Sequence, residues 1–433
     1  MGFDPVAYLN EPRWQKVSLG LSRIQRLMEL LEHPEAHLRC VHVAGTNGKG
    51  STCACLDAIC RSAGLKTGIF TSPYLTRFEE RIRVDGKDIA SEDLEACTLE
   101  VKHAAEEVQH ETGEHPTEFE LMFAVAALHF AQAGCEACIV EVGLGGRLDA
   151  TNVITPRLSV ITRIGLDHTA LLGSTIDAIA SEKAGIVKPR VPCITCEQDP
   201  AAQGVLESAC RERKSPLSVV RSADITCARL TDKLTRTFIY QGEPFETKLL
   251  GAYQPENASL AIAAARQLAS AGWPLSEKAI RQGVAQAVWP GRFQVLARHP
   301  LVIVDGAHNA DGARALAASL DEVEKLLHPS EIICVVGVLA DKDARAILEP
   351  LAARTEAFFL YAPANPRALP AADLARLASQ LAPQVEAFVC TDAQEAMGRA
   401  LKRAAPESMV AAFGSLYSIA DVTSACEAVL GAC

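Results

Sequence analysis

A glycine-rich loop after a short apolar run constrains this chain more than any other stretch. The run Val41–Ala44 is typical of a buried strand, and glycines follow at positions 45, 48 and 50. Glycine lets backbone N–H groups converge on an anion, and a helix beginning near Ser51 would add its dipole. Lys49 adds a point charge, and the hydroxyl of Ser51 or Thr52 offers magnesium a ligand. The loop therefore predicts a cradle for a nucleoside triphosphate.

The loop departs from the strict Walker pattern at two positions. The pattern expects its first glycine at position 43, which is Val43, and the residue after Lys49 is Gly50 instead of Ser or Thr. A plain glycine-rich turn is therefore the competing interpretation of this stretch taken alone.

Length and composition indicate a soluble globular protein of two or three domains. The chain has 433 residues, of which 49% are hydrophobic and 22% charged. A formal net charge of −11 argues against a nucleic-acid surface. The 15 cysteines lie at positions expected of helices and strands, as Cys53, Cys55 and Cys60 do, so we expect small buried thiols in a reducing compartment. The N-terminus has no signal-peptide pattern, and no apolar run approaches the ~20 residues of a membrane span. We therefore expect a cytoplasmic protein without membrane contacts.

Polar side chains follow two further predicted strands of the first domain. Glu141 lies near the end of the apolar run 138–142, where a buried carboxylate is costly unless it is paired or metal-bound. His168 follows the next apolar run, 158–162. Open α/β sheets bind ligands at the carboxyl ends of their strands. Both residues are therefore candidates for a magnesium site, although a lone histidine is more often structural.

Three other residues of interest have an ordinary structural interpretation. Thr117 and Glu120 have the spacing of a capping box at the start of an apolar helix. Lys183 lies on a helix that we expect to begin at Ser174, and a lysine on a helix is usually solvated. Between residues 190 and 250 we expect short strands and turns without recognisable chemistry.

A break at Trp289–Phe293 precedes a second domain with strict alternation of strands and helices. This rhythm predicts a doubly wound, Rossmann-like domain. Its first strand, 301–305, is not followed by Gly-x-Gly-x-x-Gly, so a dinucleotide is not expected. Asp305 and His308 come at the end of this strand and are candidate site residues.

Taken together, these stretches resemble the folylpolyglutamate synthases, and in particular the bacterial bifunctional dihydrofolate synthase/folylpolyglutamate synthases of the Mur ligase superfamily. The set is specific although no single motif is decisive. The matching stretches, which follow the family's order, are Val43–Thr52, Phe70–Val84, Glu141–Asn152, Asp167–Thr169, Ser181–Pro189, Asn257, Pro290–Phe293 and Asp305–Asn309.

The resemblance implies an α/β chain with a P-loop-type ATPase domain of the Mur ligase central type at 1–291 and a Rossmann-like glutamate ligase domain at 292–433. It implies an ATP-dependent amide ligase that adds L-glutamate to dihydropteroate and to the glutamyl tail of tetrahydrofolate. ATP would phosphorylate the acid, and the glutamate amine would then displace phosphate. Positioning and charge neutralisation would dominate such catalysis. Only small-molecule substrates, and a monomeric state, are expected.

The family's site residues carry over by motif. Those implied to bind ATP are Thr46, Asn47, Gly48, Lys49, Gly50, Ser51, Asn257, Arg292, Asp305 and His308. Those implied to hold Mg²⁺ are Ser72, Glu141, His168 and Lys183, the last as a carbamate. Those implied to contact dihydropteroate or folate are Thr117, Glu118, Phe119 and Glu120, together with Leu148, Asp149 and Ala150. The residues implied to be catalytic are Lys183, His168 and Lys49. Because Arg292 lies in the linker and Asp305 in the second domain, the resemblance implies that ATP contacts both domains.

One departure bears on bifunctionality. Members with both activities often carry Asp immediately before the element Leu19–Leu21, and this chain has Ser18 there. In contrast, the stretch 145–152 is similar to that of enzymes competent in dihydrofolate synthesis. We therefore favour both activities, with a monofunctional folylpolyglutamate synthase as the alternative.

Two other classes of protein share parts of the pattern. A Mur-type ligase acting on a peptidoglycan precursor would place a substrate domain of roughly a hundred residues before the phosphate loop, and this loop begins at Gly45. A nonenzymatic nucleotide switch would carry an Asn-Lys-x-Asp motif, which the sequence lacks. Both are therefore less favoured.

Overall fold

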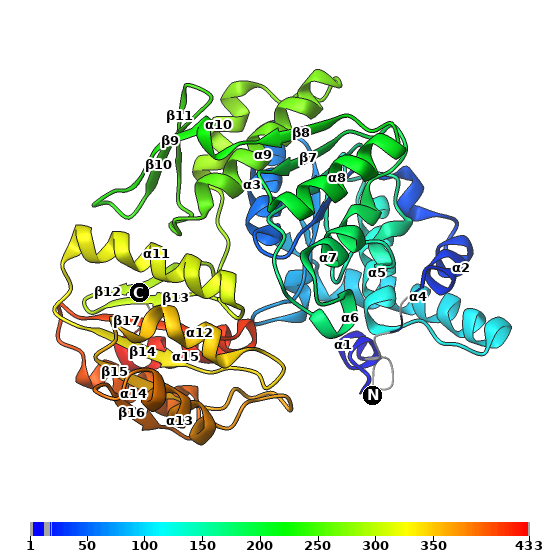
Figure 1. Cartoon of the computed structure of the whole chain (residues 1–433). Coiled ribbons are helices and arrows are strands. Elements are labelled where there is room, and N and C mark those ends of the chain that lie inside the picture. The colour runs from blue at the N-terminus through cyan, green and yellow to red at the C-terminus, as the bar shows by residue number, and fades with distance from the viewer. Residues whose placement is uncertain (1–2, 13–17, 19, 432–433) are drawn as a thin grey trace. The chain divides into compact units, whose positions relative to one another are not determined.

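The computed structural model describes residues 3–12, 18 and 20–431, and the chain forms two compact units (Figure 1). The first unit comprises residues 1–226, 240–245 and 256–287, and the second comprises 227–239, 246–255 and 288–433. The predicted domains 1–291 and 292–433 assign 227–239 and 246–255 to the first domain instead, and this boundary stays a prediction. Leu19, beside the departure at Ser18, lies outside the described residues.

The first unit is built on an eight-stranded sheet with the order β4-β3-β2-β5-β1-β6-β7-β8. β3 pairs antiparallel with both β2 and β4, and the remaining pairs of neighbouring strands are parallel. The strands are β1 (Cys40–Ala44), β2 (Thr67–Phe70), β3 (Ile82–Val84), β4 (Lys87–Asp88), β5 (Ala137–Glu141), β6 (Leu158–Ile161), β7 (Cys193–Cys196) and β8 (Leu217–Val220). Parallel strands buried on both faces read as continuous apolar runs, which is why the predicted strands are found within a residue of their expected bounds.

Helices cover both faces of this sheet. They are α1 (Pro5–Leu9), α2 (Ser22–Leu30), α3 (Lys49–Ser62), α4 (Ser91–Thr112), α5 (Glu118–Gln132), α6 (Thr169–Leu172), α7 (Ile176–Lys183), α8 (Pro200–Glu212), α9 (Gln254–Ser270) and α10 (Glu277–Gln286). α3 and α10 pack together on one face, and α5, α7 and α8 lie on the other (Figure 1). This arrangement follows from right-handed crossovers, because β1 connects to β2 in one direction across the sheet and β6 and β7 connect onward in the other.

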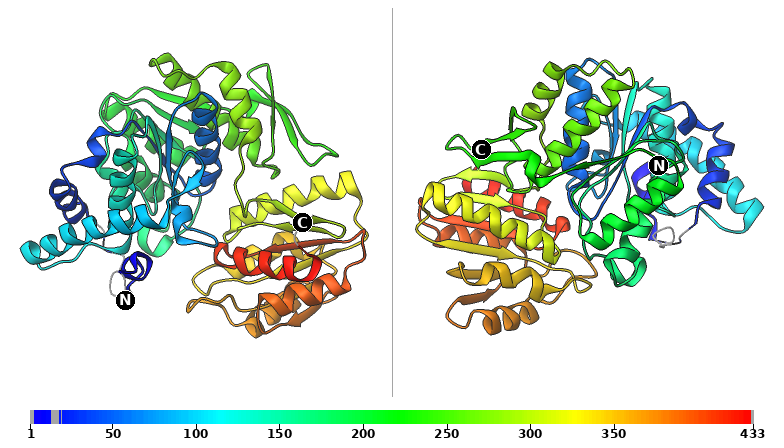
Figure 2. Two further views of the ribbon diagram at one scale, coloured as in Figure 1. Left: turned by 180° about the vertical axis from the view of Figure 1, so that it is seen from behind. Right: turned by 45° about the horizontal axis from the view of Figure 1, so that its top comes forward.

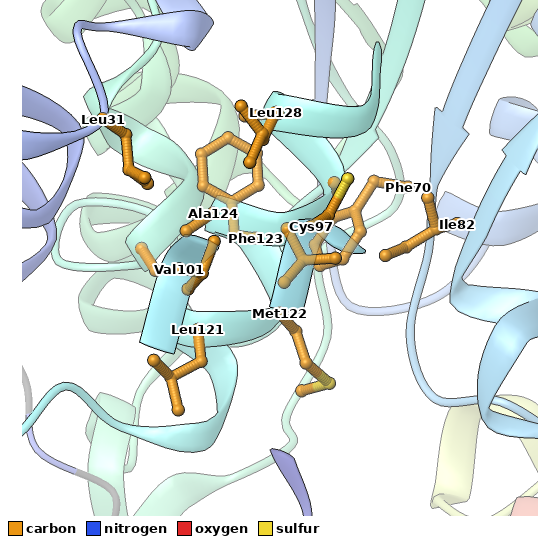
Figure 3. Packing of buried hydrophobic residues seen from close by; sticks show 14 of the residues in the cluster. Leu31, Phe70, Ile82, Cys97, Val101, Leu121, Met122, Phe123, Ala124 and Leu128 are labelled. Atoms are coloured by element: carbon orange, nitrogen blue, oxygen red, sulfur yellow. The ribbon is translucent and has the colours of Figure 1, made fainter. Parts of the chain in front are cut away.

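The core beneath α4 and α5 fixes the start of α5. Phe70 of β2 and Phe123 of α5 approach edge to face, with ring centroids 5.6 Å apart. Ile82 of β3 and Val101 of α4 belong to the same buried cluster (Figure 3). The residues immediately before α5, including Thr117, are therefore held against a rigid base.

Two local predictions are wrong. The helix that carries Lys183 is capped by Thr175, whose hydroxyl accepts from the N–H of Ala178 at 3.4 Å, and does not begin at Ser174. The stretch 190–250 contains a full helix, α8, which was expected to be strands and turns. Its signal was Asp199 followed by Pro200, because Asp199 caps the helix and proline suits its first position.

A three-stranded sheet of order β11-β10-β9 follows, and the division between the units runs through it. Its strands are β9 (Ile225–Leu230), β10 (Arg236–Tyr240) and β11 (Glu243–Thr247). The chain then enters α9 of the first unit. The second unit is therefore built from three separate segments, 227–239, 246–255 and 288–433.

The second unit contains a six-stranded sheet of order β12-β13-β17-β14-β15-β16, in which only β12 is antiparallel. The strands are β12 (Gln294–Arg298), β13 (Leu301–Val304), β14 (Ile332–Val336), β15 (Ala357–Leu360), β16 (Glu386–Val389) and β17 (Met409–Phe413). The helices are α11 (Ala310–Leu327), α12 (Ala344–Ala352), α13 (Ala371–Leu381), α14 (Ala393–Arg403) and α15 (Ile419–Leu430). α11 to α13 pack side by side, α14 packs beside α15, and the two groups cover opposite faces (Figure 2). The predicted Rossmann-like fold is confirmed, with an antiparallel edge strand added.

Two further observations concern the described residues as a whole. Their cysteines carry free thiols, and all except Cys135 and Cys227 are buried, which confirms the expectation of buried thiols. None of their helices has both the length and the apolar character required to cross a membrane.

Candidate active site

The glycine-rich loop joins β1 directly to α3. Gly48 occupies the N-cap position of α3 with φ of 92°, a left-handed conformation that favours glycine. Within the described residues, no side chain caps this end of α3. An uncapped helix N-terminus after a glycine-rich loop favours an anion, through its N–H groups and its dipole. The geometry is that of the predicted phosphate cradle.

The loop is anchored by the residues that follow β6. The N–H groups of Thr46 and Asn47 both donate to the carbonyl of Arg163, at 2.9 and 3.2 Å. The hydroxyl of Thr162 donates to the carbonyl of Asn47 at 2.8 Å, and a Cβ at Gly45 would lie only 1.8 Å from that hydroxyl oxygen. Sequence reasoning missed Thr162 and Arg163, whose only signal was their place after a predicted strand. The fold brings them to the loop because β6 pairs with β1.

Two lysine side chains converge on the same carbonyl of this loop. Lys49 Nζ lies 3.2 Å from the carbonyl oxygen of Gly45, and Lys183 Nζ donates to that oxygen at 2.8 Å. The Lys183 side chain is buried, contrary to the usual solvated lysine of a helix. Burial, followed by the positive charge of Lys49, lowers the pKa of Lys183 to about 7. Its amine is therefore partly neutral, and hence nucleophilic, near neutral pH.

The residues expected to hold magnesium have different surroundings. Glu141 is buried at the end of β5 and accepts from the N–H of Ser72 at 3.1 Å. His168 has a left-handed backbone, with φ of 50°, and its N–H donates to Asp167 at 2.8 Å. Its side chain is 44% exposed. No three His, Cys, Asp or Glu side chains of the described residues form a ready-made metal site. The hydroxyl of Ser72 and the carboxylate of Glu141 are nevertheless the hard oxygen donors that suit Mg²⁺.

The stretch 117–120 forms the N-terminus of α5. The Thr117 hydroxyl and the Glu120 carboxylate form the predicted capping box. Glu120 is buried, whereas Phe119 is partly buried against Phe70, with ring centroids 5.7 Å apart. Burial raises the pKa of the Glu118 carboxyl, and Arg81 opposes this effect from 4.0 Å. Phe119 and Glu118 are therefore better placed than Glu120 to meet a ligand.

The stretch 148–150 is held by Asp149. This buried carboxylate accepts from the N–H groups of Leu144 and Thr151, at 2.9 and 3.0 Å, and also from the Thr151 hydroxyl. Thr151 in turn contacts the buried His42 of β1, whose Nε2 lies 2.8 Å from its hydroxyl oxygen. Burial raises the pKa of the Asp149 carboxyl, and these hydrogen bonds oppose the rise. Ala150 is buried beside it, and Leu148 is exposed.

In the second unit, the candidate residues lie around Asp305, which directly follows β13. The Asp305 carboxylate accepts from the N–H of Phe293 at 2.7 Å, the N–H of Ala307 at 2.8 Å and the hydroxyl of Tyr253 at 2.8 Å. Burial raises the pKa of the Asp305 carboxyl, and the charge of Arg292 opposes the rise. Sequence reasoning missed Tyr253, because no local pattern relates it to a strand end more than fifty residues away.

Two residues predicted to contact ATP, His308 and Asn257, each lie beside a glycine. His308 Nδ1 lies 2.8 Å from the carbonyl of Gly306 within the second unit. In the first unit, Asn257 of α9 borders the phosphate loop, because a Cβ at Gly48 would lie 2.3 Å from its Oδ1. The structure thus brings Asn257 to Gly48 and Arg292 to Asp305.

Comparison with known proteins identifies the family of this chain. Residues 43–265 match the Mur ligase middle domain, and residues 291–416 match the glutamate ligase domain of Mur ligases. The dihydrofolate synthase/folylpolyglutamate synthase of Bacillus subtilis is 38% identical over 365 residues, covering 83% of this chain and 84% of the relative. The folylpolyglutamate synthase of Lacticaseibacillus casei is 36% identical over 424 residues, covering 96% of each chain.

Solved structures agree over nearly the whole length. Escherichia coli FolC in complex with DHPP and ADP has a TM-score of 0.85 and 32% identity, covering 98% of this chain and 97% of that chain. Mycobacterium tuberculosis folylpolyglutamate synthase complexed with ADP has a TM-score of 0.88 and 29% identity, covering 97% and 98%. The chain therefore belongs to the dihydrofolate synthase/folylpolyglutamate synthase family of Mur ligases.

Proposed function

We propose that this protein is an ATP-dependent ligase that joins L-glutamate to dihydropteroate and to the glutamyl tail of tetrahydrofolates. The observation that carries the proposal is the uncapped N-terminus of α3 behind its glycine-rich loop, with Lys49 and the buried Lys183 on one carbonyl. Relatives from Bacillus subtilis and Escherichia coli that bear both enzyme names support both activities. The monofunctional alternative is supported by the name of the Lacticaseibacillus casei relative.

In this proposal the reaction has two steps. A carboxylate oxygen of the acid attacks the γ-phosphorus of ATP, and the bond from that phosphorus to the bridging oxygen breaks to release ADP. The amine of glutamate then attacks the acyl carbon, loses a proton, and expels inorganic phosphate to leave an amide. The protein supplies positioning and charge, because the transferred phosphoryl group asks for little covalent chemistry.

The proposed ATP contacts follow from the site geometry and the resemblance. The residues Thr46, Asn47, Gly48, Lys49, Gly50 and Ser51 would hold the phosphates at the N-terminus of α3. The other proposed contacts are Asn257, Arg292, Asp305 and His308. Lys49, whose ammonium lies within the loop, would neutralise charge that develops on the transferred phosphoryl group.

Mg²⁺ would be held by Ser72, Glu141, His168 and a carbamate on Lys183. When bound, the ion would neutralise phosphate charge during transfer. Lys183 suits carbamylation because its neutral amine can add to carbon dioxide and release a proton, which replaces a buried cation by an anion. Without that change, the side chains of Lys49 and Lys183 share one carbonyl acceptor.

The acid substrate would bind between two segments of the first unit, Thr117–Glu120 and Leu148–Ala150. Phe119 offers an aromatic ring, and Leu148 an exposed apolar side chain. Glu120 and Asp149 hold the two segments in place through their backbone contacts. We also propose a cytoplasmic monomer, and the free, buried thiols support a reducing compartment.

The test is ADP formation by the purified full-length protein. ADP should form from ATP only when L-glutamate and a pterin acid are both present. Product with dihydropteroate and with tetrahydrofolate supports both activities, and product with tetrahydrofolate alone supports the monofunctional alternative. Activity with a UDP-muramyl substrate but with neither folate would overturn the proposal.

A further inference from the structure

A buried arginine on α2 contacts the segment that precedes α5. The Arg23 side chain is 8% exposed, and its guanidinium donates in three directions. Nη2 donates to the carbonyl of Ser18 at 2.7 Å, Nη1 to Glu114 at 2.9 Å, and Nε to Glu120 at 3.2 Å. The contacts with Glu114 and Glu120 join parts of the chain that are 91 and 97 residues apart, so this side chain connects α2 to the start of α5.

One carboxylate oxygen of Glu120 accepts three hydrogen bonds. Glu120 Oε2 accepts from Arg23 Nε, from the N–H of Thr117 at 2.7 Å and from the Thr117 hydroxyl at 2.9 Å. The other oxygen, Oε1, is buried and has no hydrogen-bond partner within the described structure. A buried carboxylate needs a partner charge. Arg23 provides this charge through the ion pair between its Nε and Glu120 Oε2.

We propose that Arg23 is a positioning residue for the acid substrate, setting the orientation of Thr117–Phe119 through the Glu120 carboxylate. This inference rests on the proposed function, in which that segment contacts the pterin acid. Arginine fits the role because its planar guanidinium donates along several fixed directions at once, whereas a lysine ammonium is a compact point charge. Lysine at position 23 would keep the charge and lose the fixed directions.

The alternative is that the Arg23 network contributes only to stability. The two roles differ in what they do to substrate binding. A positioning role affects the acid substrate and leaves ATP binding at the loop before α3 unchanged. A purely structural role lowers the unfolding temperature without changing the ratio of the two KM values.

The test compares R23K with R26K in the full-length protein. Arg26 is a matched control, since it lies on the same helix but pairs on the surface with Glu29 and Glu111. The measurements are KM and kcat with dihydropteroate and with ATP, and the Kd of dihydropteroate by calorimetry. For R23K, we expect KM and Kd for dihydropteroate to rise about tenfold, as when one well-placed contact is lost, with KM for ATP within about twofold. R26K should match the wild type in every measurement.

Three results would overturn the inference. The first is R23K with a wild-type Kd for dihydropteroate, and the second is an equal rise in both KM values. The third is unchanged hydrogen exchange at residues 114–121 in R23K, a readout that needs no activity. If wild-type protein neither binds dihydropteroate nor forms ADP with any folate, the proposed function itself fails, and this result is separate from the variant comparison. If R23K does not fold, E114Q removes the negative charge of one partner of Arg23 at the surface and should raise the Kd for dihydropteroate in the same direction.

Discussion

Among single residues, Lys183 owes its chemistry to burial. Its ammonium contacts the carbonyl of Gly45 near Lys49, and both desolvation and like charge favour the neutral amine. A pKa of about 7 means that the amine gains a proton as the pH falls below neutrality and loses it above. Carbamylation, which needs the neutral amine, should therefore be favoured by higher pH and by bicarbonate.

Lys183→Ala should lose about a hundredfold or more of the ligase activity, since in the proposed mechanism it removes the carbamate that would hold Mg²⁺ beside the transferred phosphoryl group. Short carboxylates such as formate or acetate should restore part of the rate by standing in for the carbamate. Lys188→Ala is a suitable control, because Lys188 is a nearby lysine that donates to the carbonyl of Asn152. Steady-state kinetics with and without added carboxylate measure both effects. A wild-type rate in Lys183→Ala would exclude the carbamate.

At the scale of elements, strands were predictable from the sequence where they are buried on both faces. The run at 409–413 is apolar throughout and the run at 40–44 is apolar apart from His42, and both are strands with these bounds. The helix α8 was not expected, because its buried face, formed by Ala202, Leu206, Ala209 and Cys210, consists mostly of small residues that give a weak apolar signal in the sequence. The burial of Lys183 and the role of Thr162 were also not predictable, since both depend on which strand lies beside β1.

For the candidate site too, local motifs were predictable from the sequence, whereas contacts between distant segments were not. The capping box of Thr117 and Glu120 is a local motif, and the structure contains it as expected. The partners of that motif are not local, because Arg23 reaches Glu120 from a different helix. Sequence therefore located the candidate segments, and tertiary packing assigned their supporting contacts.

The two glycines at the ends of α3 allow a controlled test of the phosphate loop. Gly48 and Gly64 both have left-handed backbones, with φ of 92° and 82°. A Cβ at Gly64 would meet open space, whereas one at Gly48 would lie 2.3 Å from Asn257 Oδ1. Gly64→Ala should therefore lower the free energy of unfolding by only about 1 kcal/mol, the cost of a left-handed alanine, and leave KM for ATP unchanged.

Gly48→Ala should lower the free energy of unfolding further and raise KM for ATP at least about tenfold, because the loop and Asn257 must separate. Thermal unfolding and KM for ATP, measured on both variants, separate backbone strain from the contact. Equal stability losses with unchanged KM for ATP in both would mean that Asn257 does not constrain the loop.

At the scale of the whole molecule, the second unit depends on segments that precede its main sheet. Arg236 of β10 is fully buried and donates to the carbonyl of Leu250 and to Glu322 of α11, each at 2.6 Å. Leu250 itself belongs to the core cluster of the second unit. The unit is therefore completed by residues 227–239 and 246–255 as well as by the continuous stretch from 288.

Arg236→Met should destabilise the second unit by about 2–3 kcal/mol, because it leaves the buried carbonyl of Leu250 without its donor and breaks the pair with Glu322, which is partly solvated. That loss corresponds to a fall of roughly 5–10 °C in the unfolding temperature of this unit. Arg298→Met is the control, since Arg298 is exposed on β12. Hydrogen exchange locates the effect: protection of β13 and β17 should fall while β1 and β5 keep theirs. Equal loss of protection in both sheets would show that the two units unfold together, and no loss at all would show that the continuous stretch from residue 288 is stable without this anchor.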